Sequence, residues 1–176
     1  MNAVRLMHYD PRWRQEFEQT RSSILSSTEG WVIGVEHIGS TAISGLIARP
    51  TIDLVAGVDD VNGLDTAATL IEGLNFRREE GPTWAPEASW LVKPRYLTAD
   101  QPDPTHRVLL VIHSSPSWQR VIRLRDWLRT KAETAIRFEE AKVARWRNGD
   151  GDLEKYRSDK ALFFSHLEDQ IDSSGS

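Results

Sequence analysis

The sequence predicts one α+β domain, in which a mixed β-sheet is flanked by helices and the C-terminal part of the chain is helical. Most strand-like segments precede His113, and the residues after it show helical patterns. The 176 residues are enough to bury a core, and they show no linker and no internal repeat. We expect a single domain over 1–171 and a flexible tail over 172–176.

The composition is that of a soluble globular protein. Charged residues make up 27% of the chain and hydrophobic residues 39%, and the net charge of −4 disfavours nucleic acid or an anionic membrane as a partner. No segment is long and apolar enough for a membrane span or a signal peptide, so we expect a cytoplasmic protein. The absence of cysteine excludes disulfides, thiolate metal sites and a cysteine nucleophile.

The first half of the chain alternates between helix and strand signals. Asp10 and Pro11 are typical of the start of a helix, because aspartate caps free N–H groups and proline suits the first turn. The two strand-like segments are largely apolar, which is typical of buried strands. We expect helices over 11–27 and 59–74, and strands over 32–38 and 51–58.

The second half predicts three strands followed by helices. Pro94 removes a backbone N–H, so we expect the strand that contains it to lie at an edge of the sheet. Ser115 and Pro116 begin a helix in the same way as Asp10 and Pro11. We expect strands over 76–80, 90–96 and 106–113, and helices from 116, over 133–147 and over 153–171.

A sharp turn, Gly39-Ser40-Thr41, connects the first two predicted strands. Such a turn directs backbone N–H groups and two hydroxyls at one spot, which suits phosphate, although a plain tight turn has the same pattern. Asp53 lies among apolar residues on the next strand, where it either binds a divalent cation or has a structural capping role. His37, beside the turn, either reaches a ligand or is a satisfied structural histidine.

Two cations lie where the helical pattern calls for apolar residues. Lys160 is three residues before Phe163 in the last predicted helix, and Arg125 is three before Leu128 in an earlier one. A buried cation is costly without an anion, so each should meet a carboxylate or a bound phosphate. The candidate carboxylate partners are Glu36, Asp53 and Asp126.

Several motifs together resemble the GrpB family, which belongs to the nucleotidyltransferase-fold superfamily. The resemblance implies a nucleotidyltransferase-like mixed sheet with flanking helices, in which the Gly-Ser turn and Asp53 form the nucleotide-binding end. The motifs are Tyr9-Asp10-Pro11-x-Trp13, Glu36 to Ala42, Arg49 to Asp53, Ser115-Pro116-x-Trp118, Arg123 to Arg129 and Tyr156-x-x-x-Lys160.

The chain departs from catalytic nucleotidyltransferases at two positions. Those enzymes follow Gly-Ser with Asp-x-Asp or Asp-x-Glu and add a third carboxylate on a later strand, because two Mg²⁺ ions need that cluster. Here Val55 takes the second position, and the later strand carries Arg107 and Leu109, where the GrpB pattern shows a His-x-His-like element. A site with one metal ion or none therefore fits the sequence better than a two-metal site. In such a site Lys160, Arg125 and Arg107 would act as charge clamps.

The sequence thus predicts a nucleotidyltransferase-like domain that binds a nucleotide or another phosphorylated small molecule. If it is an enzyme, we expect transfer of a nucleotidyl or phosphoryl group to a small molecule, with Asp53 and Lys160 as catalytic residues and Mg²⁺ on Asp53. The alternatives are a catalytically inactive ligand-binding or protein-interaction module on the same fold, and an enzyme of different chemistry. The expected phosphate ligands are His37, Gly39, Ser40, Thr41, Arg125 and Lys160.

Overall fold

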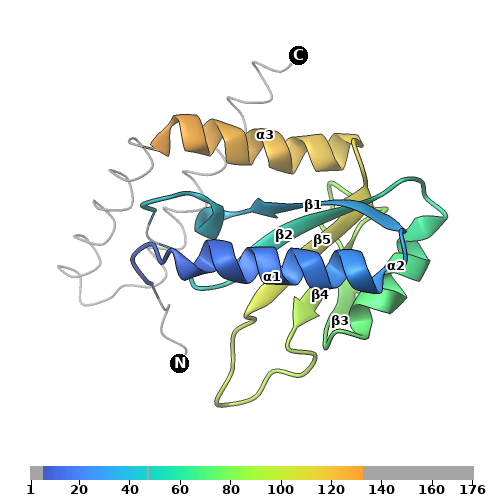
Figure 1. Cartoon of the computed structure of the whole chain (residues 1–176), viewed down its shortest axis with the longest axis horizontal. Helices are drawn as coiled ribbons and strands as arrows, with labels where there is room; N and C mark the ends of the chain where they lie inside the picture. Colours follow the sequence, from blue (N-terminus) through green and yellow to red (C-terminus); the bar gives the residue numbers. More distant parts are fainter. Residues whose placement is uncertain (1–5, 47, 133–176) are drawn as a thin grey trace.

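The computed structural model describes residues 6–46 and 48–132, and within them a five-stranded sheet has helices on both faces (Figure 1). The predicted helices over 133–147 and 153–171, Lys160 and the predicted tail lie outside the described residues. The elements are α1 (Arg12–Ser27), β1 (Val32–Ile38), the 3₁₀ helix η1 (Ser40–Ala42), β2 (Ile52–Val58), α2 (Gly63–Glu72), β3 (Arg77–Glu80), β4 (Ser89–Lys93), β5 (His106–Ile112) and α3 (Pro116–Thr130).

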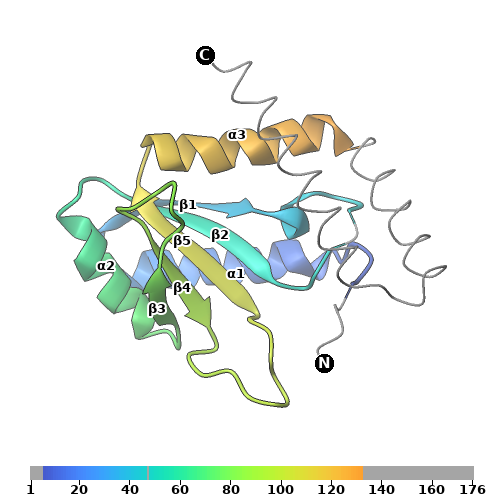
Figure 2. The same cartoon turned by 180° about the vertical axis from the view of Figure 1, so that it is seen from behind.

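The sheet is mixed, with the strand order β1-β2-β5-β4-β3. β2 and β5 are parallel, and the other neighbouring strands are antiparallel. The predicted α+β class, with a mixed sheet flanked by helices, is confirmed. Figure 2 shows the same sheet from behind, where β3 and β4 lie away from β1.

The two faces of the sheet are covered by different helices. Because side chains alternate along a strand, Leu54 and Ala56 of β2 face α1 and α2, whereas Val55 of β2 and Leu109 of β5 face α3. Trp118 of α3 packs on the second pair. α1 and α3 therefore lie on opposite sides of β1 (Figure 1).

Two predictions about strand positions are wrong. β4 pairs with both β3 and β5, so it is an inner strand, and Pro94 costs no ladder hydrogen bond because it follows the last residue of the strand. β1, which the sequence predicts as a buried strand, is an edge strand within the described residues, and Ile33 on it is 50% exposed.

Side chains cap the starts of both long helices much as the sequence predicts. The Oδ1 atom of Asp10 accepts a hydrogen bond from the N–H of Arg12 at 2.9 Å. The Oγ atom of Ser115 accepts one from the N–H of Trp118 at 3.3 Å.

α2 begins later than predicted, at Gly63, because 59–62 form a turn ahead of it. In the part of the chain that is described, no helix has the length and apolar character to cross a membrane.

The cap of α3 gives a first prediction. Ser115→Ala should lower the free energy of unfolding by about 1 kcal/mol, because the N–H of Trp118 loses its acceptor. Urea denaturation followed by far-UV circular dichroism measures this value. Ser23→Ala, at an exposed position inside α1, is the matched control and should stay within about 0.5 kcal/mol of the wild type. Equal losses in both variants would argue against the cap.

Candidate functional site

The turn after β1 is built on Gly39. Its φ of +75° lies in the left-handed region that favours glycine. A Cβ at this position would also lie 2.7 Å from the Oδ2 atom of Asp53, closer than such atoms approach one another. The structure therefore brings Gly39 and Asp53 together, and it does so by contact between the carboxylate and the backbone of the turn.

His37 is a buried, neutral histidine at the wall of a cleft. Its side chain is 6% exposed, and its ring stacks on Phe17 with 4.8 Å between centroids. Its Nε2 atom lies 2.9 Å from the Oγ1 atom of Thr41, whose hydroxyl donates to the carbonyl of Thr51 at 3.3 Å. Burial, together with the positive charges of Arg129 and Arg125, lowers the pKa of His37 to about 4.

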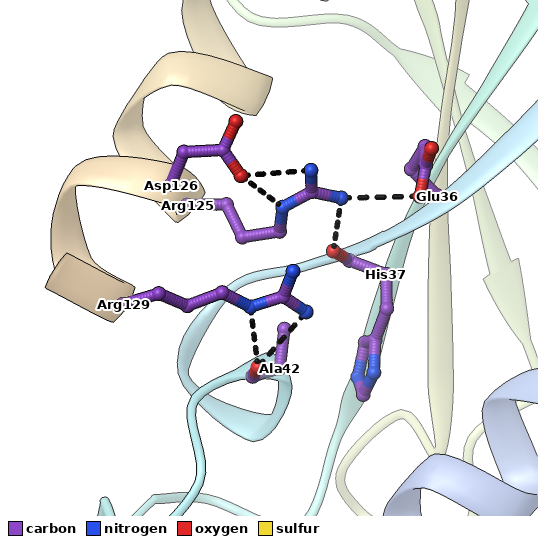
Figure 3. A network of polar contacts seen from close by, with 6 residues as sticks. All are labelled: Glu36, His37, Ala42, Arg125, Asp126 and Arg129. Carbon is purple, nitrogen blue, oxygen red and sulfur yellow. Dashed lines mark hydrogen bonds and ion pairs between the residues drawn. The ribbon is translucent and has the colours of Figure 1, made fainter. Parts of the chain in front are cut away.

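Arg125 connects α3 to β1 through oxygen atoms of the protein (Figure 3). Its Nη1 atom donates to the carboxylate of Glu36 at 3.1 Å and to the carbonyl of His37 at 3.4 Å. Its Nε and Nη2 atoms donate to Asp126 at 3.0 and 2.9 Å. The side chain is 10% exposed and does not line the cleft. Two of the three carboxylate partners that the sequence suggests, Glu36 and Asp126, are thus the observed ones.

Arg129, one helical turn further along α3, is held differently (Figure 3). Its Nε and Nη2 atoms both donate to the carbonyl of Ala42, at 3.3 Å each. Burial lowers its pKa, and the charges of Arg125 and Arg14 act in the same direction. Among the described residues, neither Arg129 nor Arg14 forms an ion pair with a carboxylate.

A cleft of about 530 Å³ lies beside the edge strand β1, where α1, the turn and the end of α3 meet. Its wall carries two arginines, two glutamates, one neutral histidine and three hydroxyl-bearing side chains. This combination suits a small ligand with anionic groups. The lining residues are Tyr9, Arg14, Phe17, Glu18, Glu36, His37, Thr41, Ala42, Ile43, Ser44, Arg129 and Ala132.

Asp53 does not line this cleft, and it faces an arginine on the next strand. β2 and β5 pair in a register that sets Asp53 beside Arg107, with 4.0 Å between Oδ1 and Nη1. The guanidinium of Arg107 lies over the ring of Trp90 at 4.1 Å. Within the described residues no three carboxylates or histidines gather as metal ligands, so the donor set around Asp53 does not fit a carboxylate-held Mg²⁺ centre.

The predicted site residues therefore separate into two places. Thr41 and His37 line the cleft, whereas Gly39 contacts Asp53. Ser40, the first residue of η1, is not among the lining residues, and Lys160 lies outside the described residues.

Sequence reasoning missed the two arginines of the cleft wall. Arg129 carried a usable signal, because it follows Arg125 by four residues and so shares its helix face. Arg14 carried none, since an arginine on the polar face of a helix is ordinary.

Comparison with known proteins relates most of the chain to one family. A family model described as GrpB protein matches residues 3–170. A UPF0157 protein of Halalkalibacterium halodurans is 29% identical over 144 residues, which are 81% of this chain and 68% of that protein. The dephospho-CoA kinase of Mycobacterium tuberculosis is 26% identical over 92% of this chain, but the match covers 44% of the kinase.

The fold is also found in a solved structure. The crystal structure of the conserved protein GrpB from Enterococcus faecalis matches with a TM-score of 0.75 over 95% of this chain and 96% of that chain. The sequence identity is 22%, so the match establishes a shared fold. The α+β arrangement described above is thus also found in that solved structure.

The two neighbouring arginines of α3 should differ in their effect on stability. Arg125→Met should lower the free energy of unfolding by about 1–3 kcal/mol, because charge-assisted hydrogen bonds to Glu36 and Asp126 are lost while the aliphatic stem is kept. Arg129→Met removes two long bonds to one carbonyl and should cost less than about 1 kcal/mol. Urea denaturation measures both, and a larger loss for Arg129→Met would contradict this division of roles.

His37 should make the protein sensitive to acid. The unfolded chain takes up a proton near the ordinary pKa of 6.5 and the folded protein near 4, so stability is lost as the pH falls through this range. His37→Gln should remove about 1.5 kcal/mol of the stability lost between pH 6.5 and 5. Urea denaturation at both pH values measures this effect.

Two further histidines complete that measurement. His106, whose pKa burial and the charge of Lys93 also lower to about 4, should account for a second part of the acid loss. His8→Gln changes an exposed histidine and is the control. A pH dependence that His37→Gln leaves unchanged would contradict the burial of a neutral imidazole.

Proposed function

The chain belongs to the GrpB family, and from this premise we propose that it is a nucleotidyltransferase-like domain that binds a nucleotide or another phosphorylated small molecule. The proposed binding site is the cleft beside β1. In this proposal Arg129 and Arg14 attract the negative charge of the ligand. The hydroxyl of Ser44 supplies a hydrogen bond from the turn side.

The observation that carries the proposal is the convergence of Arg129 and Arg14 on one cleft, where within the described residues neither forms an ion pair. Arg125 is neutralised by Glu36 and Asp126. The charge of Arg14 helps to lower the pKa of Arg129, the charges of Asp126 and Glu36 act in the opposite direction, and within the described residues no ion pair neutralises either arginine. Two like charges at one cleft repel each other, and a bound anion would remove that repulsion.

A relative supports the class of ligand. The mycobacterial protein that matches almost the whole chain is named a dephospho-CoA kinase, and dephospho-CoA is a nucleotide derivative. Because the match covers 44% of that protein, the kinase activity itself is not carried over to this chain. The relative supports the proposal because the matching sequence is part of a protein whose name gives it a nucleotide derivative as substrate.

The reaction that we propose for an active enzyme is transfer of a nucleotidyl or phosphoryl group to a small molecule. Lys160, outside the described residues, belongs to this proposal as a second charge clamp and catalytic residue. Asp53, in contact with Gly39 and outside the lining of the cleft, remains the proposed catalytic carboxylate, and in this proposal the reacting group of the ligand extends past the turn to reach it. A cytoplasmic location is part of the same proposal, since nucleotides are abundant there.

A second candidate function is a ligand-binding module without catalysis. The observation that favours it is the environment of Asp53. The next residue on the same face of β2 is Val55, and its partner on β5 is Leu109, and both are completely buried and apolar. A two-metal transfer needs further carboxylates beside the first. Under this alternative the cleft still binds an anion, and its occupation regulates a partner instead of supplying a substrate.

Nucleotide binding gives the test of the proposal. ATP, ADP, AMP and pyrophosphate, each with and without Mg²⁺, should raise the melting temperature if they bind the folded state. Arg129→Ala and Arg14→Ala should each weaken the affinity for the best of these ligands by about tenfold, because a charge-assisted contact is lost. Isothermal titration calorimetry measures the dissociation constants.

Matched controls lie on the same two helices. Arg123→Ala on α3 and Arg12→Ala on α1 remove the same charge at exposed positions that do not line the cleft. Their affinities should stay within about twofold of the wild type, because screened surface charges contribute little. A melting temperature that no phosphorylated ligand raises, or equal losses in all four variants, would refute the proposed site.

A further inference from the structure

A row of side chains crosses the sheet on the face that α3 covers, away from the cleft. It begins at the backbone of Gly39, passes through Asp53 on β2 and Arg107 on β5, and ends at Trp90 on β4. Each member contacts the next. The sequence predicts a divalent cation at this end of the sheet. The side chains of the row determine whether such a cation can bind beside Asp53.

Arg107 is fixed in this row from two sides. The parallel ladder between β2 and β5 sets it beside Asp53, and the main-chain hydrogen bonds of that ladder hold the register. Its guanidinium lies 4.1 Å from the ring of Trp90, within the range of a cation–π contact. Its side chain is 40% exposed, so the group is held in place without being buried.

Among the described residues, the paired strands around Asp53 offer few oxygen ligands to a metal ion. Mg²⁺ and Mn²⁺ need several oxygen ligands, and carboxylates are the main protein donors. The next residues on the same faces of the two strands are Val55 and Leu109, which have no oxygen in their side chains. The guanidinium of Arg107 sets a positive charge 4.0 Å from Asp53. A metal ion there would be repelled by that charge.

We infer that the guanidinium of Arg107 takes the place of a divalent cation beside Asp53. The carboxylate and the arginine then form a permanent pair, and a ligand reaching this end of the sheet meets a fixed organic cation instead of an exchangeable metal ion. The inference concerns this row and does not depend on whether the cleft beside β1 binds a nucleotide. Any Mg²⁺ that accompanies a nucleotide would be coordinated by the phosphates of that nucleotide and not by Asp53.

Mn²⁺ binding to the full-length protein without nucleotide tests the inference. Mn²⁺ accepts the same oxygen ligands as Mg²⁺, and its binding is measured by water-proton relaxation. The wild type and Asp53→Asn should give the same relaxation enhancement, because Asp53 holds no metal ion. Arg107→Asp should bind Mn²⁺ about tenfold or more tightly than the wild type, because two carboxylates then face each other across paired strands. The double variant Arg107→Asp/Asp53→Asn should lose that gain.

Two results would overturn the inference. One is Mn²⁺ binding by the wild type that Asp53→Asn removes, and this measurement requires no change at Arg107. The other is an Arg107→Asp variant that is folded by circular dichroism and yet binds Mn²⁺ no better than the wild type, since Arg107 would then not occupy a cation position. The nucleotide titrations use the other site, so either proposal can fail while the other stands.

Discussion

The parallel pairing of β2 with β5 is the interaction on which the rest of the structure depends. It joins two strands that are distant in sequence, Ile52–Val58 and His106–Ile112, along their whole length. The apolar side chains of both strands then form a core on each face, one under α1 and α2 and the other under α3. The same register sets Asp53 beside Arg107, so one set of main-chain hydrogen bonds determines both the core and the charge pattern at the end of the sheet.

Two arginines of α3 have different roles, one in stabilising the fold and the other in the proposed binding of a ligand. Arg125 and Arg129 lie four residues apart on one helix face, and their different partners follow from what stands opposite each. Arg125 meets a carboxylate at the edge strand, which turns a costly buried cation into a connection between helix and sheet. Arg129 meets a carbonyl of the turn instead, so within the described residues it reaches the cleft without an ion pair, and Asp126 and Glu36 act on its charge only from a greater distance.

Local signals in the sequence predicted the local structure well. The helix starts at Asp10 and Ser115 and the turn at Gly39 depend on neighbours a few residues away, which a reader of the sequence can see. Strand order was not predictable in this way, because it depends on which distant segments pair. β4, which Pro94 suggested as an edge strand, therefore pairs on both sides, and β1, whose apolar pattern suggested a buried strand, lies at an edge within the described residues. The arginines of the cleft were missed for the same reason, since only the packing of α1 beside the turn brings Arg14 near Arg129.

The carbonyl of Ala42 has a consequence for the entropy of binding. It accepts two hydrogen bonds from Arg129, so it orders that long side chain before any ligand arrives. A free arginine side chain loses rotamer entropy worth about 2 kcal/mol when it is fixed, and here much of that loss has already occurred during folding. Such a preorganised cation discriminates by shape as well as by charge, because an anion with the wrong geometry cannot draw the side chain toward it.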